Sequence, residues 1–144
     1  RPSYKNIFRG QRCLIPATGF FEWKRNSDKS KQPFRITLES EELFAFAGIW
    51  DHVTPKNFPE NGPVTSCSII TTSCNRLMKP IHDRMPVILP RNHYADWLNP
   101  HNDNIEDLQD MLRPFDSDLM SSYEVSNLVN SSKNTTSEVL KPLE

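Results

Sequence analysis

The feature that most constrains this chain is a stretch bracketed by prolines, residues 80–90, with the sequence PIHDRMPVILP. Each proline fixes its own φ angle and disfavours helical geometry at the residue before it. We therefore expect Ile81–Met85 to form a rigid, non-helical connection. In an extended backbone, alternation places His82 and Arg84 on one face and Asp83 on the other.

The polar residues in this stretch suit an anionic ligand. The imidazole of His82 is a group that moves protons near neutral pH, and the guanidinium of Arg84 can grip a phosphate or carboxylate through two hydrogen bonds. The alternative is structural: Asp83 and Arg84 would brace a turn, and His82 would fill a half-buried position.

The length of 144 residues suits one domain with its own core. We expect a single domain over residues 1–130, followed by a loose polar tail over residues 131–144 that is rich in Asn and Ser. No apolar run reaches the roughly 18 residues of a membrane span, so we expect no membrane partner. Because the chain begins Arg-Pro-Ser without Met, we expect a fragment or a processed product.

Three cysteines, Cys13, Cys67 and Cys74, lie in or beside apolar runs without any CxxC pair. This pattern favours reduced thiols in a cytoplasmic protein over disulfides, and it argues against a structural zinc site. The four histidines are scattered, and four glycines exclude a Gly-rich phosphate loop. We therefore expect neither a metal nor a cofactor.

The net charge of −1 conceals an asymmetry along the chain. Residues 1–36 carry nine Lys and Arg against two acids, a net charge of +7, and residues 96–144 carry three against ten, a net charge of −7. Such separation can create a one-sided field that attracts polyanions, although the charges could equally pair with one another.

Short apolar and alternating segments predict an α+β fold, namely a mainly antiparallel, barrel-like β-sheet with peripheral helices. The nearly continuous apolar run Phe44–Trp50 should be a central strand buried on both faces. Residues 51–64 should form an irregular loop. Further strands are expected at Cys13–Ile15 (ended by Pro16), Gly19–Lys24, Pro33–Leu38, Ser66–Thr72 and Tyr123–Val129, and helices at Ser3–Arg9, after Pro90 and at Asn104–Leu112.

Glu22 is a lone carboxylate among the aromatic residues Phe20, Phe21 and Trp23. A carboxyl group held against an aromatic surface loses hydration, which favours its neutral, proton-donating form. The alternative is an edge-strand Glu that points to water or pairs with Arg12 or Lys24. A second polar cluster is Thr71 and Thr72, followed by Ser73 as the cap of a helical turn, where hydroxyl and N–H groups suit phosphate oxygens.

Four motifs in sequence order together resemble the SRAP (SOS response-associated peptidase) family. They are CLIPAxGFFEW at residues 13–23, FAFAGIW at 44–50, IITT at 69–72 and IHDRMP at 81–86. Each motif is moderately specific, and the four together are strongly so. The resemblance extends from the first residues to about Asn130.

The resemblance implies an abasic-site processing protein of the DNA-damage response that binds single-stranded DNA and captures abasic sites covalently. In the family, a Cys that becomes the N-terminus after autocatalytic Met removal condenses with the sugar aldehyde and closes a thiazolidine ring. By this resemblance Glu22 assists ring opening and proton transfer, His82 is the general acid/base, and the DNA-binding residues are Arg84, Thr71 and Trp23. We expect a monomer in a bacterial or phage-encoded, nucleoid-associated setting.

The chain departs from the family pattern in one respect. Family members begin Met-Cys-Gly-Arg, followed by roughly eighty residues before the part seen here, so we expect this chain alone to lack covalent capture. Two alternatives stay open: a non-catalytic single-stranded DNA-binding module, and a thiol peptidase that uses an internal Cys, Cys74 or Cys67, with His82 and Glu22.

Overall fold

The computed structural model describes residues 8–54, 56, 60 and 62–143. The chain forms two compact units, and each of them combines segments distant in the sequence. Unit 1 comprises Arg1–Pro16, Ala45–Thr72 and Pro86–Pro114, and unit 2 comprises Ala17–Phe44, Ser73–Met85 and Phe115–Glu144.

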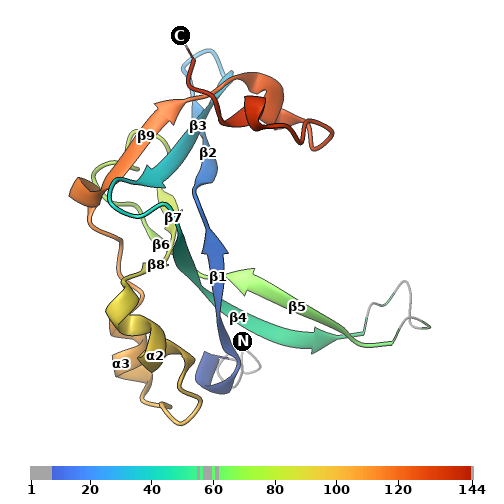
Figure 1. Ribbon diagram of the computed structural model, residues 1–144, viewed down its shortest axis with the longest axis vertical. Helices are drawn as coiled ribbons and strands as arrows, with labels where there is room; N and C mark the ends of the chain where they lie inside the picture. Colours follow the sequence, from blue (N-terminus) through green and yellow to red (C-terminus); the bar gives the residue numbers. More distant parts are fainter. Residues whose placement is uncertain (1–7, 55, 57–59, 61, 144) are drawn as a thin grey trace. The chain divides into compact units, whose positions relative to one another are not determined.

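Unit 1 is built on a sheet with the strand order β1-β4-β5, in which β8 also pairs with β4 (Figure 1). β4 and β5 pair antiparallel from Gly48↔Ile69 to Val53↔Val64. The pairing ends at Ile70, whose N–H donates to the Ala47 carbonyl and whose carbonyl accepts from the Val87 N–H, both at 2.9 Å. The strands are β1 (Arg12–Ala17), β4 (Phe44–Val53), β5 (Val64–Ile69) and β8 (Ile88–Leu89).

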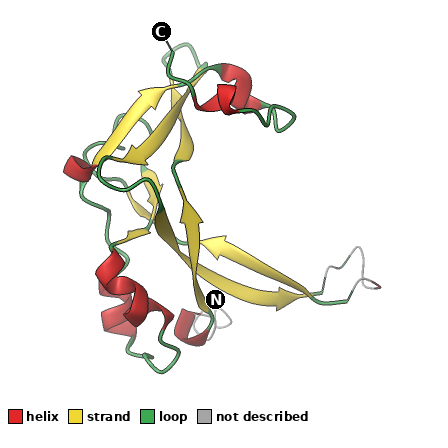
Figure 2. Ribbon diagram, viewed as in Figure 1, coloured by secondary structure: helices red, strands yellow, loops and turns green. Residues whose placement is uncertain are grey.

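Short helices complete the core of unit 1 (Figure 2). They are η2 (Arg91–His93), α2 (Tyr94–Leu98) and α3 (Ile105–Asp110). Trp97 of α2 is fully buried, and its indole N–H donates to the Cys13 carbonyl at 2.9 Å. Asn104 caps α3 by accepting from the backbone N–H groups of Glu106 and Asp107. The core cluster consists of Ala47, Val87, Leu89, Trp97 and Leu108.

Arg12 is a buried cation in unit 1, with 6% of its surface exposed. Its Nε donates to the Trp97 carbonyl at 2.6 Å, and its terminal nitrogens donate to the carbonyls of Phe8, Arg9, Asn99 and Asn102. All five guanidinium N–H donors are therefore satisfied by backbone carbonyls. Desolvation lowers the pKa of Arg12, while the carbonyl dipoles stabilise its charged form.

Unit 2 contains an antiparallel sheet with the order β2-β3-β9. The β2–β3 register pairs Glu22 with Phe34 and Trp23 with Pro33, and the β3–β9 register pairs Phe34 with Glu124. Alternation places the buried residues Ile36 and Leu38 on the same face of β3. The strands are β2 (Phe20–Arg25), β3 (Lys31–Leu38) and β9 (Met120–Glu124).

The C-terminal segment of unit 2, which the sequence predicts to be a loose tail, makes contacts with β9 in its described residues. Tyr123 Oη donates to the Leu140 carbonyl at 3.0 Å, and the Leu143 N–H donates to the Glu124 carbonyl at 2.9 Å. Val125 and Pro142 form an antiparallel bridge. Three 3-10 helices lie in this region: η3 (Ser117–Leu119), η4 (Asn127–Asn130) and η5 (Ser137–Leu140).

The α+β class with antiparallel sheets is confirmed, but the described residues form separate sheets and no closed barrel. β1 continues through Pro16 to Ala17, β4 continues to Val53 instead of ending before a loop at Asp51, and the last strand ends at Glu124 because Ser126 caps η4. The predicted helix Ser3–Arg9 lies largely outside the described residues. None of the described helices is long and apolar enough to cross a membrane.

Candidate functional site

A hydrogen-bonded turn over residues 75–83 carries the His-Asp-Arg motif. The Cys74 N–H donates to the Asp83 carbonyl at 3.0 Å, and the N–H groups of Ile81 and His82 both donate to the Met78 carbonyl. The cap of this turn is Asn75, whose Oδ1 accepts from the Met78 N–H at 3.0 Å, and not Ser73 as predicted. The connection is non-helical, as the proline spacing predicts.

Apolar residues anchor this turn on both sides of the motif. Ile81 is 8% exposed and Met85 is 1% exposed, whereas His82, Asp83 and Arg84 between them are exposed. The sequence therefore presents three polar side chains to solvent from a backbone that is held by two buried neighbours. Arg84 begins β7 (Arg84–Pro86), which pairs with β6 (Thr71–Ser73).

The His82 ring is held through Nδ1. This atom lies 3.1 Å from the Arg84 backbone nitrogen and 3.2 Å from the Arg84 carbonyl oxygen. It also lies 3.3 Å from Asp83 Oδ1, so Asp83 contacts His82 and does not occupy the opposite face as predicted. Unprotonated Nδ1 accepts from the Arg84 N–H, and protonated Nδ1 donates to either oxygen. Nε2 therefore remains the nitrogen available for a ligand in both states.

Glu22 lies on β2, half-buried and paired across the sheet with Phe34. Its Oε1 accepts a hydrogen bond from the Trp23 backbone N–H at 3.0 Å. Within the described residues it forms no ion pair with Lys24, and the guanidinium of Arg12 is fully used by carbonyls. No ion pair of Glu22 is therefore seen among the described residues. Because β2 is an edge strand of its sheet, a carboxyl group set against aromatic surface and one that points to water both stay predictions.

Trp23 is oriented by the C-terminal part of unit 2. Its indole Nε1–H donates to Asn130 Oδ1 of η4 at 2.7 Å, and its backbone pairs with Pro33. The indole ring is half-buried, so part of its surface stays accessible. Sequence reasoning did not predict the contact with Asn130, because the two residues are 107 positions apart.

Of the five predicted site residues, Glu22, Trp23, His82 and Arg84 belong to unit 2, and Thr71 is an exposed residue of unit 1. In the described part of the chain, no hydrogen bond or ion pair joins Glu22 to His82. Their joint action therefore stays a prediction. No three His, Cys, Asp or Glu side chains among the described residues are grouped so that they could hold a metal ion.

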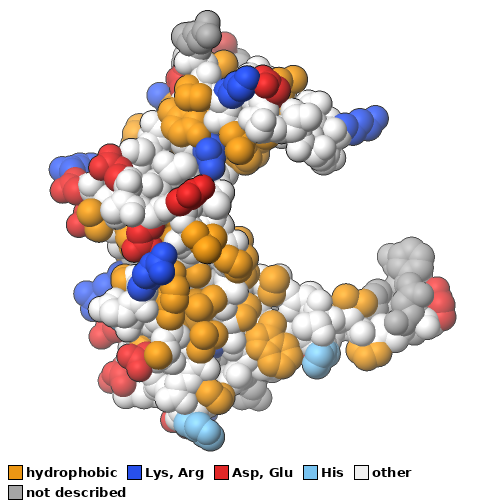
Figure 3. Space-filling model, viewed as in Figure 1, with side chains coloured by type: hydrophobic (Ala, Val, Ile, Leu, Met, Phe, Trp, Pro, Cys, Tyr) orange, Lys and Arg blue, Asp and Glu red, His pale blue; other side chains and the backbone are white. Residues whose placement is uncertain are grey.

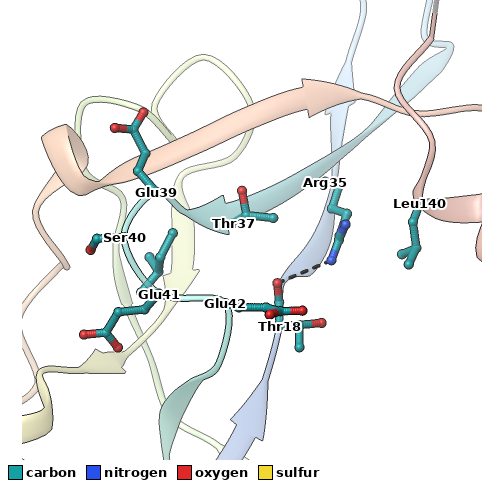
Figure 4. Close-up of a pocket in the computed structure, with 9 residues that line it drawn as sticks. Thr18, Arg35, Thr37, Glu39, Ser40, Glu41, Glu42 and Leu140 are labelled. Carbon is teal, nitrogen blue, oxygen red and sulfur yellow. Dashed lines mark hydrogen bonds between the residues drawn. The ribbon is translucent and has the colours of Figure 1, made fainter.

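A separate pocket of about 570 Å³ lies in unit 2, beside the β3 face that carries Arg35 and Thr37 (Figure 4). Arg35 donates to Tyr123 Oη at 2.8 Å and to the Thr18 carbonyl at 3.4 Å. None of the predicted site residues lines this pocket. Sequence reasoning missed it because its walls come from separate segments: Thr18, Arg35, Thr37, Leu38, Glu39, Ser40, Glu41, Glu42 and Leu140.

Comparison with known proteins agrees with the motif pattern. Residues 1–132 match the family described as SOS response associated peptidase (SRAP). The chain is 48% identical over 141 residues to the abasic site processing protein YoqW of Bacillus subtilis, covering 98% of this chain and 62% of YoqW. It is 32% identical over 165 residues to the abasic site processing protein HMCES of Gallus gallus, covering 100% of this chain and 47% of HMCES.

A crystal structure of a protein from Bacteroides thetaiotaomicron has the same fold, with a TM-score of 0.86 and 33% identity. The match covers 99% of this chain and 62% of that protein. The chain therefore spans less than two thirds of the length of these relatives. The family match over nearly the whole sequence, the four motifs and the shared fold agree: the chain belongs to the SRAP family.

Proposed function

We propose that this chain is the DNA-recognition and acid–base part of an abasic-site processing protein. The relatives YoqW and HMCES are both named abasic site processing proteins, and each matches this chain over at least 98% of its length. The observation that carries the proposal is the His82 turn, which holds the ring through Nδ1 while the His82 side chain next to Arg84 is 43% exposed. The His82 imidazole on this turn can transfer a proton beside a phosphate that Arg84 binds.

The proposed reaction captures the ring-opened aldehyde of an abasic site. The amine of a terminal Cys attacks the aldehyde carbon, and loss of one water molecule gives an imine. The thiol then adds to the imine carbon and transfers its proton, so that a thiazolidine closes. Cys13, Cys67 and Cys74 cannot perform both attacks because their amines are in peptide bonds, so the nucleophile must come from outside these 144 residues.

Two residues of unit 2 carry out the proton transfers in this reaction. Glu22 assists opening of the sugar ring and proton transfer at the attacking amine, and His82 Nε2 acts as the general acid/base. The same pair would serve autocatalytic removal of an initiator Met. Arg84 holds a DNA phosphate, Thr71 lines the site, and the accessible surface of Trp23 contacts a base of single-stranded DNA.

The test is the intact mass of the protein after incubation with a single-stranded oligonucleotide that carries one abasic site. Residues 1–144 are compared with a fusion in which the family's Met-Cys-Gly-Arg segment precedes them. We expect an adduct with the fusion only. In the fusion, His82→Gln should slow adduct formation on the order of a hundredfold or more, the usual effect of removing a general acid/base.

The matched control is His101→Gln, which changes another exposed histidine outside the motif and should leave the rate unchanged. An adduct with residues 1–144 alone would show that a Lys or another amine captures the aldehyde. If the His82→Gln fusion formed the adduct as fast as the parent fusion, His82 would have no role in the mechanism.

A thiol peptidase that used Cys13 in place of Cys74 or Cys67 is disfavoured. Burial and the neighbouring Cys67 raise the pKa of the Cys13 thiol, and a catalytic thiol requires the opposite shift. Adduct formation by fusions with Cys13→Ser, Cys67→Ser or Cys74→Ser should be unaffected. The non-catalytic alternative would show salt-dependent binding of single-stranded DNA but no adduct with the fusion.

A further inference from the structure

The turn between β2 and β3 presents three exposed cations, which we call the basic hairpin tip. The tip consists of Arg25, Lys29 and Lys31 and belongs to unit 2. Figure 3 shows Lys and Arg side chains at the surface of the part of the molecule that β2, β3 and β9 form. Among the described residues, none of the three tip cations forms an ion pair. Their charges are therefore available to an anionic ligand.

Hydrogen bonds fix the backbone of this turn. The Asn26 N–H donates to the Ser30 carbonyl at 2.9 Å, and the Lys29 N–H donates to the Asn26 carbonyl at 3.1 Å. Asp28 Oδ1 accepts from the hydroxyl and the backbone N–H of Ser30, at 2.6 and 2.9 Å. These hydrogen bonds lower the pKa of Asp28. The one acid in the sequence of residues 24–31 therefore shapes the turn and does not pair with the tip cations.

Two features of the tip cost stability without a compensating contact. Lys29 has a φ angle of 69°, and this left-handed region usually takes Gly or Asn because a Cβ is strained there. Arg25 and Lys31 are cross-strand partners, and like charges directly opposite each other on a sheet are destabilising. Local choices that oppose the stability of a fold are typical of functional positions.

The tip continues the face of the hairpin that carries Trp23. Alternation along β2 puts Trp23 and Arg25 on one face, and the cross-strand pairing puts Lys31 on that face too. Arg25 is two residues beyond Trp23, which is about 7 Å at the rise of a β-strand. This distance equals about two phosphate spacings along one strand of stacked DNA. A strand with a base on Trp23 therefore has phosphates within reach of the tip.

We propose that the basic hairpin tip binds backbone phosphates of single-stranded DNA, about two nucleotides beyond the base that contacts Trp23. The contacts go to the sugar–phosphate backbone, so they hold the strand without reading its sequence. Phosphates between Arg25 and Lys31 relieve the repulsion that these two cations have in the free protein. The proposal rests on DNA as the ligand in the proposed function, but it does not require covalent capture of an abasic site.

The first test measures binding by fluorescence anisotropy. The probe is a labelled single-stranded oligonucleotide that carries tetrahydrofuran, an abasic analogue without an aldehyde, and the protein is the 144-residue chain. We expect the triple variant Arg25→Gln, Lys29→Gln and Lys31→Gln to bind on the order of tenfold more weakly at low salt. Each lost phosphate contact reduces the slope of log K against log salt by about 0.7, so the slope should become shallower by about 2.

The matched control changes three exposed cations outside the hairpin, namely Lys56→Gln, Arg113→Gln and Lys141→Gln. The two triple variants have the same net charge, so a difference in affinity between them locates the binding surface. We expect the control to keep the affinity and the salt slope of the parent. Circular dichroism of both variants should match that of the parent, because all six side chains are exposed.

Lys29 offers a test in which stability and binding change in opposite directions. Lys29→Gly removes both the strained Cβ and the charge, so the urea midpoint should rise while the affinity for the oligonucleotide falls about threefold or more. Lys29→Arg keeps the charge and the strain, so it should keep the stability and the affinity of the parent. A residue with only a structural role in the turn would not lose binding on conversion to Gly.

Four results would overturn the proposal. The 144-residue chain could fail to bind the oligonucleotide, the two triple variants could weaken binding equally, or Lys29→Gly could bind as well as the parent. The tip variants could also weaken binding only to an oligonucleotide with a duplex flank, which would make double-stranded DNA the partner. If the fusion forms no adduct but the tip variants still weaken binding, the proposed capture fails and the tip proposal stands.

Discussion

The two units of this molecule place their polar side chains differently. In unit 1, the guanidinium of Arg12 is inside the fold, and five backbone carbonyls occupy all of its donors. In unit 2, the polar residues His82 and Arg84 stand exposed between the buried residues Ile81 and Met85. A buried cation whose donors are all satisfied has none left for a ligand.

This difference separates polar residues that stabilise the fold from polar residues that are exposed at the surface. The basic first quarter of the sequence is not a uniform DNA-binding surface, since Arg12 is structural and Arg35 bonds Tyr123 and Thr18. The exposed cations Arg25, Lys29 and Lys31 lie instead around the β2–β3 turn of unit 2. Substitution of polar residues should therefore destabilise unit 1 and impair binding by unit 2.

The largest expected loss of stability follows substitution of Arg12. Arg12→Met keeps most of the side-chain volume but leaves five carbonyl oxygens without their donor. We expect the free energy of unfolding to fall by about 3 kcal/mol or more. Urea denaturation at neutral pH measures this change. The control is Arg25→Met, an exposed residue, which should change the free energy by no more than about 0.5 kcal/mol. Equal effects of the two variants would contradict the structural role of Arg12.

We expect a smaller loss of stability when either of two glycines, one in each unit, is replaced by Ala, and we expect the two losses to differ. A Cβ at Gly19 would lie 2.8 Å from the Ile36 carbonyl oxygen, which is rigid backbone. The nearest atoms to a Cβ at Gly48 would be side-chain atoms of Cys13 and Ile15, which can shift more easily than backbone. We expect Gly19→Ala to cost about 2 kcal/mol and Gly48→Ala about 1 kcal/mol or less. Thermal or urea unfolding of both variants provides the comparison, and the reverse order would contradict it.

The smallest expected effect concerns the thiol of Cys13. Burial, and secondarily Cys67, raises its pKa, so the folded protein keeps this proton to a higher pH than the unfolded chain does. Above the pKa of the unfolded thiol, the unfolded state binds fewer protons, and stability should fall as the pH rises. Cys13→Ser should reduce this decline in urea unfolding measured from pH 7 to 10. An unchanged slope would show that Cys13 does not contribute to it.

Local sequence predicted those features that depend on neighbouring residues. β-forming residues located β2, alternation located β3, and a nearly continuous apolar run located most of β4. The prolines predicted the non-helical turn at residues 80–86. The motifs predicted the family.

Features that depend on distant partners were predicted less well. β9 was placed three residues too late, because its register with β3 depends on residues more than 80 positions away. The tail was predicted to be loose, because its contacts with Tyr123 and Glu124 have no local signal. The pocket around Arg35 and the bond between Trp23 and Asn130 were missed for the same reason.

By itself, the sequence determined where most strands and turns form and the family to which the chain belongs. Only the tertiary structure decided that Arg12 is a buried structural cation and that His82 is held through Nδ1. The physical reason is that backbone conformation follows from local sterics and hydrophobic pattern. Burial and hydrogen-bond partners depend on which distant segments come together.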